Sequence, residues 1–298
     1  MYVILGASGN TGGVIANTLL DRGQKVRVVG RDAAHLQSLA AKGAETFIAD
    51  LTDSGTLTQA FQHADSAYVM IPPNVTSTDY LGHANRISDA IVAAVRNAGT
   101  KNVVALSSIG ADKTSGTGPV VGLHNLEQKL NQIASANVLH LRPGYFMENT
   151  LPQVNAIRQM GVVATPLRAD LKLGMIATRD IGSAAVDAFL HPVTGKHTRE
   201  LVGQRDLTYP EVAATIGKAI GKPDLKYVQA PDDQFRSVMV QMGMSEPFAR
   251  LLLEMIGSLN SGSMRALEPR TAQNTTPTSY ETFVSEYFVP AYQQQPAA

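Results

Sequence analysis

The chain has 298 residues, of which 44% are hydrophobic and 17% charged, and this length can bury one large core or two modest ones. Its 25 basic residues balance its 25 acidic ones, which argues against bulk nucleic acid or an anionic membrane surface as a partner. The absence of cysteine excludes disulfides, thiolate zinc sites and a cysteine nucleophile, and no apolar run reaches the ~18 residues of a membrane span.

The first half of the chain alternates strand-like and helix-like segments. The apolar, β-rich runs that predict strands lie at residues 2–5, 25–31, 44–50, 66–73, 102–108 and 137–144. Helical patterns fall between them at residues 14–21, 32–43, 53–64, 80–98 and 123–134. Such alternation predicts a parallel sheet covered by helices on both faces, and right-handed crossovers favour the doubly wound strand order 3-2-1-4-5-6.

This rhythm ends after Gly144. Further helices are predicted at residues 146–161, 178–191, 207–222 and 246–259, and residues 291–298 are predicted to form a frayed tail. We therefore expect an α/β fold in two parts. A Rossmann-type doubly wound parallel sheet would occupy residues 1–150, and a smaller, mainly helical substrate part residues 151–298, with the chain crossing between the two.

Three glycines follow the first predicted strand and open the first predicted helix. Gly6, Gly9 and Gly12 form a G-x-x-G-x-x-G pattern, and Ser8, Asn10 and Thr11 add short polar side chains at its rim. Glycines in this context allow a tight turn, a close approach of backbone N–H groups to a pyrophosphate, and close packing of helix on strand. The pattern predicts a dinucleotide site at the helix N-terminus; the alternative is an ordinary glycine-rich βα turn.

The end of the second predicted strand indicates which dinucleotide binds. Gly30 holds the position where NAD sites place a carboxylate for the ribose 2′-hydroxyl, and Arg31 follows it. An arginine can bind a 2′-phosphate bidentately, so NADP(H) is favoured over NAD(H). The alternative is a solvated surface arginine, and Asp32 is interpreted as a helix N-cap.

Two more strand ends are expected to face the cofactor. Asp50 is predicted to accept from the adenine amino group, with Leu51 beside the ring. Ile71, Pro72 and Pro73 are predicted to form an apolar wall near the nicotinamide-side ribose, although the prolines could simply end the strand.

Three stretches resemble the NmrA-like group of atypical short-chain dehydrogenases/reductases. They are ILGASGNTGG at residues 4–13, VVGRD at 28–32 and LRPGYFMEN at 141–149. The group includes NADPH-dependent quinone, azo-dye and triphenylmethane-dye reductases, isoflavone-type reductases, and proteins that bind NADP(H) without reducing anything. The resemblance therefore implies the fold and the cofactor and leaves open whether the protein is an enzyme.

The helix after the fifth predicted strand lacks the Tyr-x-x-x-Lys pair of ordinary short-chain dehydrogenases. Relatives keep a lysine four or five residues before the glutamate that corresponds to Glu127, where this chain has Leu123 and Gly122. The helix offers His124 instead, three residues before Glu127, which could orient it. His124 is a candidate proton donor or ribose contact, and the alternative is that His124 and Glu127 form a structural pair.

Hydroxyl and aromatic side chains follow the fifth and sixth predicted strands. Ser107 and Ser108 stand where such enzymes place a substrate-bonding hydroxyl, Ser107 as a cofactor contact and Ser108 as a candidate catalytic residue. Tyr145 and Phe146 are predicted to line the mouth of a cleft for a planar substrate. The alternative is that they seal the junction between the two parts of the chain.

Two functions remain open from the sequence. The first is an NAD(P)H-dependent oxidoreductase that reduces quinones or similar planar, electron-poor compounds by hydride transfer. The second is a non-catalytic NADP(H)-binding redox sensor that acts through a regulatory protein partner. We expect a cytoplasmic protein with a small planar substrate, without a metal, nucleic acid or membrane partner, and compatible with a homodimer. An open apolar pocket beside the nicotinamide would favour the oxidoreductase.

Overall fold

A seven-stranded sheet organises the larger part of the computed structural model, which describes residues 1–294. Its strand order is β10-β6-β5-β4-β1-β2-β3, and every neighbouring pair is parallel. The strands are β1 (Tyr2–Leu5), β2 (Val26–Gly30), β3 (Glu45–Ile48), β4 (Ser66–Val69), β5 (Asn102–Leu106), β6 (Asn137–Pro143) and β10 (Lys196–Leu201). The predicted order of the first six strands is confirmed, and β10 extends the sheet beside β6.

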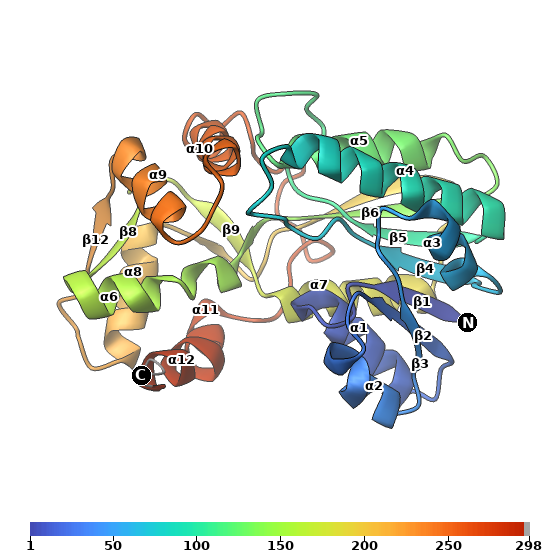
Figure 1. Ribbon diagram of the computed structural model, residues 1–298. Coiled ribbons are helices and arrows are strands. Elements are labelled where there is room, and N and C mark those ends of the chain that lie inside the picture. The colour runs from blue at the N-terminus through green and yellow to red at the C-terminus, as the bar shows by residue number, and fades with distance from the viewer. Residues whose placement is uncertain (295–298) are drawn as a thin grey trace.

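Helices cover both faces of this sheet (Figure 1). One face carries α1 (Asn10–Asp21), α2 (Gln37–Ala41) and α7 (Thr178–Leu190), and the other carries α3 (Ser54–Phe61), α4 (Tyr80–Ala98) and α5 (Val120–Asn131). Successive strand residues point to opposite faces, so Val3 and Leu5 join one apolar core while Ile4 joins the other. The predicted helix at 32–43 is shorter than expected, since a 3-10 turn over Ala34–Leu36 precedes α2.

The smaller part contains strands that the sequence reading did not predict. One sheet has the order β11-β9-β7 and the other pairs β12 with β8. Their bounds are β7 (Tyr145–Phe146), β8 (Val162–Thr165), β9 (Leu173–Ile176), β11 (Asp206–Leu207) and β12 (Lys226–Gln229). The helices of this part are α6 (Gln153–Met160), α8 (Tyr209–Ala219), α9 (Asp232–Gln241), α10 (Glu246–Asn260), α11 (Tyr280–Phe283) and α12 (Val289–Gln293).

Two expectations about this part need correction. The helix predicted over 146–161 is divided, because a 3-10 turn at Met147–Thr150 precedes α6 and Pro152 stands at the N-cap of α6. Residues 291–293 of the predicted frayed tail belong to α12, and residues 295–298 lie outside the described residues.

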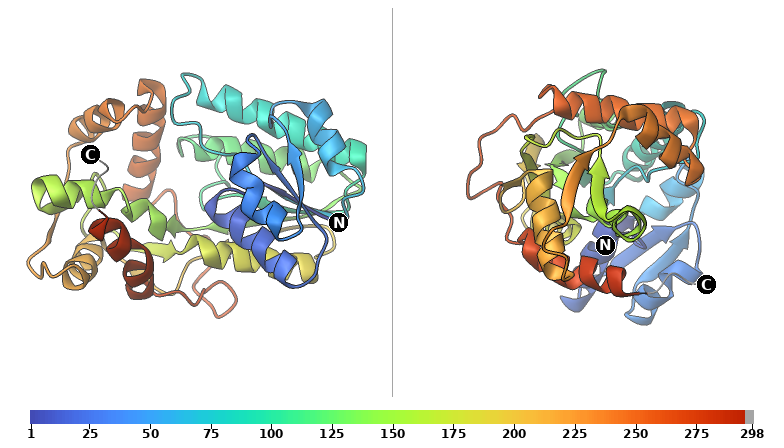
Figure 2. Two further views of the ribbon diagram at one scale, coloured as in Figure 1. Left: turned by 60° about the horizontal axis from the view of Figure 1, so that its bottom comes forward. Right: turned by 90° about the vertical axis from the view of Figure 1, so that its left-hand side faces the viewer.

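The chain returns to the large sheet after its first excursion into the smaller part (Figure 2). Helix α7 packs on α1 through Gly182, where a Cβ would lie 2.7 Å from the Val14 side chain, and β10 then joins the sheet edge. The division at residue 150 therefore stays a proposal in which residues 178–201 are a crossing back to the larger part. No helix within residues 1–294 is long and apolar enough to cross a membrane.

Candidate functional site

The glycine loop between β1 and α1 has a shape that only glycine permits at two positions. Gly6 adopts a left-handed backbone with φ of 64°, and its carbonyl accepts from the Gly9 N–H at 2.9 Å. A Cβ on Gly12 would lie 2.3 Å from the Gly6 oxygen, so helix and loop are in direct backbone contact. Within the described chain no side chain caps the α1 N-terminus, and its first turn carries no acidic residue. This cradle fits a dinucleotide pyrophosphate, for which the free N–H groups and the helix dipole are suited.

The polar residues of this loop do not all face the rim. Ser8 and Asn10 are exposed, whereas Thr11 is buried and its hydroxyl oxygen accepts from the Tyr68 hydroxyl at 2.9 Å. The Thr11 side chain therefore fixes α1 to the sheet, and only its backbone is available at the rim. Burial also raises the pKa of the Tyr68 hydroxyl, which stays protonated and donates to Thr11.

The ends of β2 and β3 bring Arg31 and Asp50 near each other. Arg31 is exposed, and it lies close enough to contribute slightly to the lowered pKa of Asp50, whose main cause is the backbone hydrogen bond from Thr52. The Thr52 N–H and hydroxyl both donate to Asp50 Oδ1 at 2.8 Å. Leu51 is buried in the core, and Asp32 accepts from the Ala34 N–H at 2.8 Å, which is a local turn contact.

The carboxyl end of β4 leads into a loop that contacts the smaller part. Ile71 is buried, Pro72 is half-buried and Pro73 is exposed. Further along this loop, Ser245 at the start of α10 donates from its N–H to the Val75 oxygen at 2.9 Å and from its hydroxyl to the Ser77 oxygen at 2.5 Å. These bonds hold the start of α10 against the loop between β4 and α4. The strand order of the sheet reverses between β1 and β4, and ligands bind at such a point in folds of this kind.

A buried ion pair, and not the expected His124–Glu127 pair, lies behind the end of β5. Arg142 binds Glu127 through both Nε, at 2.9 Å, and Nη2, at 2.5 Å, and the Ser107 hydroxyl donates to the same carboxylate. The hydrogen bond to Glu127 is the main cause that raises the pKa of Arg142. Glu127 is 3% exposed, so Arg142 and Ser107, and not bulk water, satisfy its carboxylate oxygens.

His124 points elsewhere. Its Nδ1 lies 2.8 Å from the Ala111 oxygen, so the ring donates there and holds the loop that follows β5. The expected orientation of His124 by Glu127 is therefore wrong. The physical reason is that Glu127 faces the buried ends of β5 and β6, while the half-buried His124 faces the loop.

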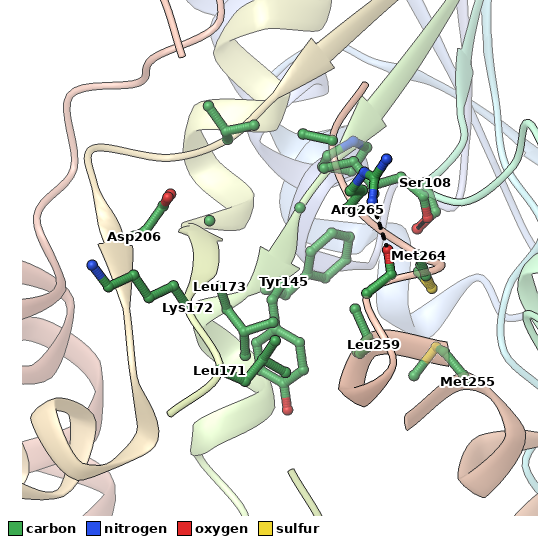
Figure 3. Close-up of a pocket in the computed structure, with 18 of the residues that line it drawn as sticks. Ser108, Tyr145, Leu171, Lys172, Leu173, Asp206, Met255, Leu259, Met264 and Arg265 are labelled. Carbon is green, nitrogen blue, oxygen red and sulfur yellow. Dashed lines mark hydrogen bonds between the residues drawn. The ribbon is translucent and has the colours of Figure 1, made fainter. Parts of the chain in front are cut away.

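A cavity of about 460 Å³ lies between the two parts of the chain (Figure 3). Ser108, just beyond β5, and residues 143–146, from the last residue of β6 through β7, form one side of it. The other lining residues are Ile109, Asn149, Leu171, Lys172, Leu173, Gly174, Val202, Asp206, Met255, Leu259, Gly262, Met264, Arg265 and Ala266. Most of these side chains are apolar, as is typical of sites for small organic ligands.

Tyr145 contributes its ring to the cavity, but its hydroxyl is occupied. The Tyr145 and Tyr209 hydroxyls lie 2.8 Å apart, and burial raises the pKa of Tyr145 to about 12. The phenol therefore stays protonated near neutral pH. Phe146 and Ser108 also line the cavity, so the structure brings together three of the residues singled out from the sequence.

The sequence reading missed the far wall of the cavity. Residues 171–174 lead into β9, and Met255, Leu259 and the 262–266 segment come from α10 and the chain after it. Glu200 on β10, 3% exposed, positions this segment by accepting from the Leu267 N–H at 2.9 Å and the Glu268 N–H at 3.0 Å. The only feature of the sequence that could have indicated this contact is Glu200, a carboxylate within the β-rich run TREL at residues 198–201. That pattern does not indicate which residues the carboxylate would bind.

The sheet order, the glycine loop at its reversal point and the helices on both faces define a Rossmann-like α/β protein. The chain belongs to the NmrA-like family, whose sequence pattern matches residues 2–288.

Characterised proteins of several activities resemble the chain. It is 29% identical over 257 residues to an NAD(P)H azoreductase from Xenophilus azovorans, covering 86% of each chain. Its fold is similar to that of an NADPH-dependent quinone oxidoreductase from Escherichia coli in complex with NADPH, with a TM-score of 0.83, 24% identity, and 97% of this chain and 100% of that chain covered. The triphenylmethane reductase of a Citrobacter species matches with a TM-score of 0.80 at 17% identity, over 98% of this chain and 99% of that one.

Proposed function

We propose that the protein is an NAD(P)H-dependent oxidoreductase that prefers NADP(H) and reduces quinones or similar planar, electron-poor compounds. The observation that carries this proposal is the apolar cavity beyond the ends of β5 and β6, at the same carboxyl edge of the parallel sheet as the glycine loop that follows β1. The names of the relatives support it, since they include an azoreductase and a quinone oxidoreductase. A sensor that only binds the cofactor has no need of an open cavity at that point.

We propose that the cofactor lies across the carboxyl ends of the strands, from β3 to β5. The residues that would hold it are Gly6, Ser8, Gly9, Asn10, Thr11 through its backbone, Gly12, Arg31, Asp50, Leu51, Ile71, Pro72, Pro73 and Ser107. When bound, the reduced nicotinamide supplies a hydride which, with one proton from solvent, converts a quinone to its hydroquinone and leaves the oxidised cofactor. The cradle at Gly12 orients the pyrophosphate, and the buried Arg142–Glu127–Ser107 contacts fix the end of β5.

The preference for NADP(H) rests on Arg31. It is exposed at the end of β2, and it takes part in no ion pair with the described residues. Residue 30 is glycine, where NAD sites have an aspartate or glutamate, so no carboxylate at this position repels a 2′-phosphate. Removing the guanidinium should raise the Kd for NADPH by roughly 10- to 100-fold, because a charge-assisted bond contributes about 1.5–3 kcal/mol. The Kd for NADH should stay unchanged.

Ser108, Tyr145 and Phe146 are the proposed substrate contacts. The two aromatic rings give a planar compound an apolar surface to lie on, and the Ser108 hydroxyl can donate to its carbonyl or azo nitrogen. His124 does not line the cavity, so its proposed part as proton donor would run from Nε2 through solvent. Hydride addition to a quinone needs little acid assistance, which agrees with the missing Tyr-x-x-x-Lys pair.

The test follows the absorbance of NADPH with purified protein and a panel of quinones, azo dyes and aldehydes. We expect steady consumption with at least one quinone or azo dye and a lower KM for NADPH than for NADH. The Arg31→Ala variant is the matched control for the cofactor, since its effect should be confined to NADPH. If the protein binds NADPH tightly and does not oxidise it with any compound of the panel, the proposed oxidoreductase activity is refuted and the sensor is favoured.

A further inference from the structure

The charges around the cavity are unequal. Three of its lining residues are charged, namely Lys172, Asp206 and Arg265. Lys172 belongs to the segment before β9, Asp206 starts β11, and Arg265 follows α10. Figure 3 places Lys172 and Arg265 on opposite sides of Tyr145, with Asp206 on the side of Lys172. Their balance decides which charge a bound compound meets.

The negative charge of Asp206 is already compensated. Arg270 pairs with its carboxylate through Nη2 and also donates to the backbone oxygens of Val202 and Gly203. Asp206 therefore serves to anchor the segment after α10 and contributes little net charge to the cavity.

The two cations have no such partner. Neither Lys172 nor Arg265 forms an ion pair with any residue from 1 to 294, and Arg265 makes only a long contact of 3.4 Å with the Gly262 oxygen. Lys172 contributes to the lowered pKa of the Glu211 carboxyl, but it is the smallest of several causes. Its oxygen already accepts from the Thr208 N–H and hydroxyl at 2.8 Å, as the capping box of α8. The cavity thus carries an excess of positive charge beside an apolar interior.

We propose that the positive charges of Lys172 and Arg265, one on either side of Tyr145, give the cavity a subsite for an anionic substituent, a carboxylate or a sulfonate, at one end of a planar substrate. This inference rests on the proposed function, because it assigns a substrate class to the same cavity. The aromatic body would lie on the Tyr145 and Phe146 rings, and the anionic group would lie toward one of the two exposed cations. The same charges disfavour cationic aromatic compounds, so the subsite selects by charge as well as by shape.

The experiment compares two dyes that share one skeleton. para-Methyl red carries a carboxylate at pH 7.5, and its methyl ester is uncharged; crystal violet serves as a cationic dye. Binding is measured by equilibrium dialysis with saturating NADP⁺, which prevents turnover, and bleaching is measured separately with saturating NADPH. The variants are Lys172→Glu, Arg265→Glu and the pair together. Lys226→Glu is the matched control, because Lys226 is exposed on β12, outside the cavity lining, and changes the net charge equally.

The decisive quantity is the affinity for the carboxylate dye divided by that for the ester, since hydrophobic contacts cancel in this ratio. Reversing the cation that the anionic group faces should lower this ratio by roughly fivefold or more, as expected when an exposed ion pair is replaced by repulsion. The double variant should show this loss whichever of the two cations is the partner. Raising the ionic strength should lower the ratio of the parent protein, and crystal violet should bind more tightly to the double variant. The Lys226→Glu variant should keep the parent ratio, and the neutral Lys172→Gln and Arg265→Gln variants should give intermediate values.

Several outcomes would overturn the subsite. It is wrong if the ratio in both reversed variants equals that of the parent, if neither dye binds, or if the Kd for NADPH rises in the variants, which would assign the cations to the cofactor. Absence of bleaching, together with charge-dependent binding of the carboxylate dye, would refute the proposed reduction and leave the subsite standing.

Discussion

Replacing Gly12 with alanine tests whether the start of α1 holds the cofactor. The added Cβ would lie 2.3 Å from the Gly6 oxygen, whereas ordinary contacts begin at 3.4 Å, so the backbone must open by about 1.1 Å. Helix α1 cannot move far from the loop, because Gly182 already brings α7 against Val14. The loop itself must therefore open, and the N–H groups that face the pyrophosphate shift with it.

The expected cost follows from these distances. Overpacking of this kind destabilises a fold by about 1–3 kcal/mol. Losing the alignment of one backbone N–H with a phosphate removes about 1.5–3 kcal/mol of binding, so the Kd for NADPH should rise by roughly 10- to 100-fold.

The assay is a titration of NADPH fluorescence, which tyrosine emission does not obscure in a protein without tryptophan. Circular dichroism records the thermal midpoint of each variant and shows whether each variant is folded at the temperature of the NADPH titration. Gly13→Ala is the matched control, because its Cβ would lie 3.3 Å from the Ala7 oxygen and needs almost no adjustment. A Gly12→Ala variant that is folded and binds NADPH as tightly as the Gly13→Ala variant would refute the role given to this turn.

Three further predictions concern the site and its supports. His140 has a pKa of about 4, lowered chiefly by burial, with Nε2 at 2.9 Å from Asn131 Oδ1 and Nδ1 without a partner among residues 1–294. The imidazole of His140 binds a proton more readily in the unfolded chain, so the free energy of unfolding should fall by about 1.5 kcal/mol from pH 6.5 to 5.0, as measured by urea titrations. A His140→Gln variant whose free energy of unfolding falls equally over this pH range would contradict this prediction. Arg142→Met leaves the Glu127 charge buried and should cost about 3–5 kcal/mol, while adding Glu127→Gln should recover part of the loss in the same titrations. His124→Ala should reduce quinones more slowly if the ring delivers the proton through solvent, and an unchanged kcat with a lower thermal midpoint would leave it only the loop contact at Ala111.

Local patterns were enough to predict six of the seven strands of the large sheet, and the edge strand β10 was missed. Apolar runs such as residues 2–5 have side chains on two buried faces, and the intervening helical stretches are long enough to cross over the sheet. The glycine loop could also be predicted from local sequence, because its three glycines directly follow the strand at residues 2–5. The shorter strands β7 and β11 have two residues each, which is too few for any periodicity to appear.

The supports of the site depend on contacts that sequence proximity does not reveal. His124 stands three residues from Glu127 on α5, and proximity suggested a pair, yet Glu127 binds Arg142, which lies 15 residues away on β6. The far wall of the cavity likewise unites residues 171–174 with 255–266, segments brought together by the fold alone. Ser108, Tyr145 and Phe146 were found because they directly follow strands whose ends meet at one edge.

Glu200 fixes the path of the segment after α10 through main-chain contacts, so the path of this segment does not depend on the side chains that it presents to the cavity. The buried carboxylate binds backbone N–H groups of Leu267 and Glu268, and it makes no use of the side chains at 264–266, which line the cavity. Substitutions at Met264, Arg265 or Ala266 can therefore alter what the cavity accepts while the chain keeps its path. A wall anchored through its main chain can exchange the side chains that line the cavity by single substitutions, without disturbing the large sheet.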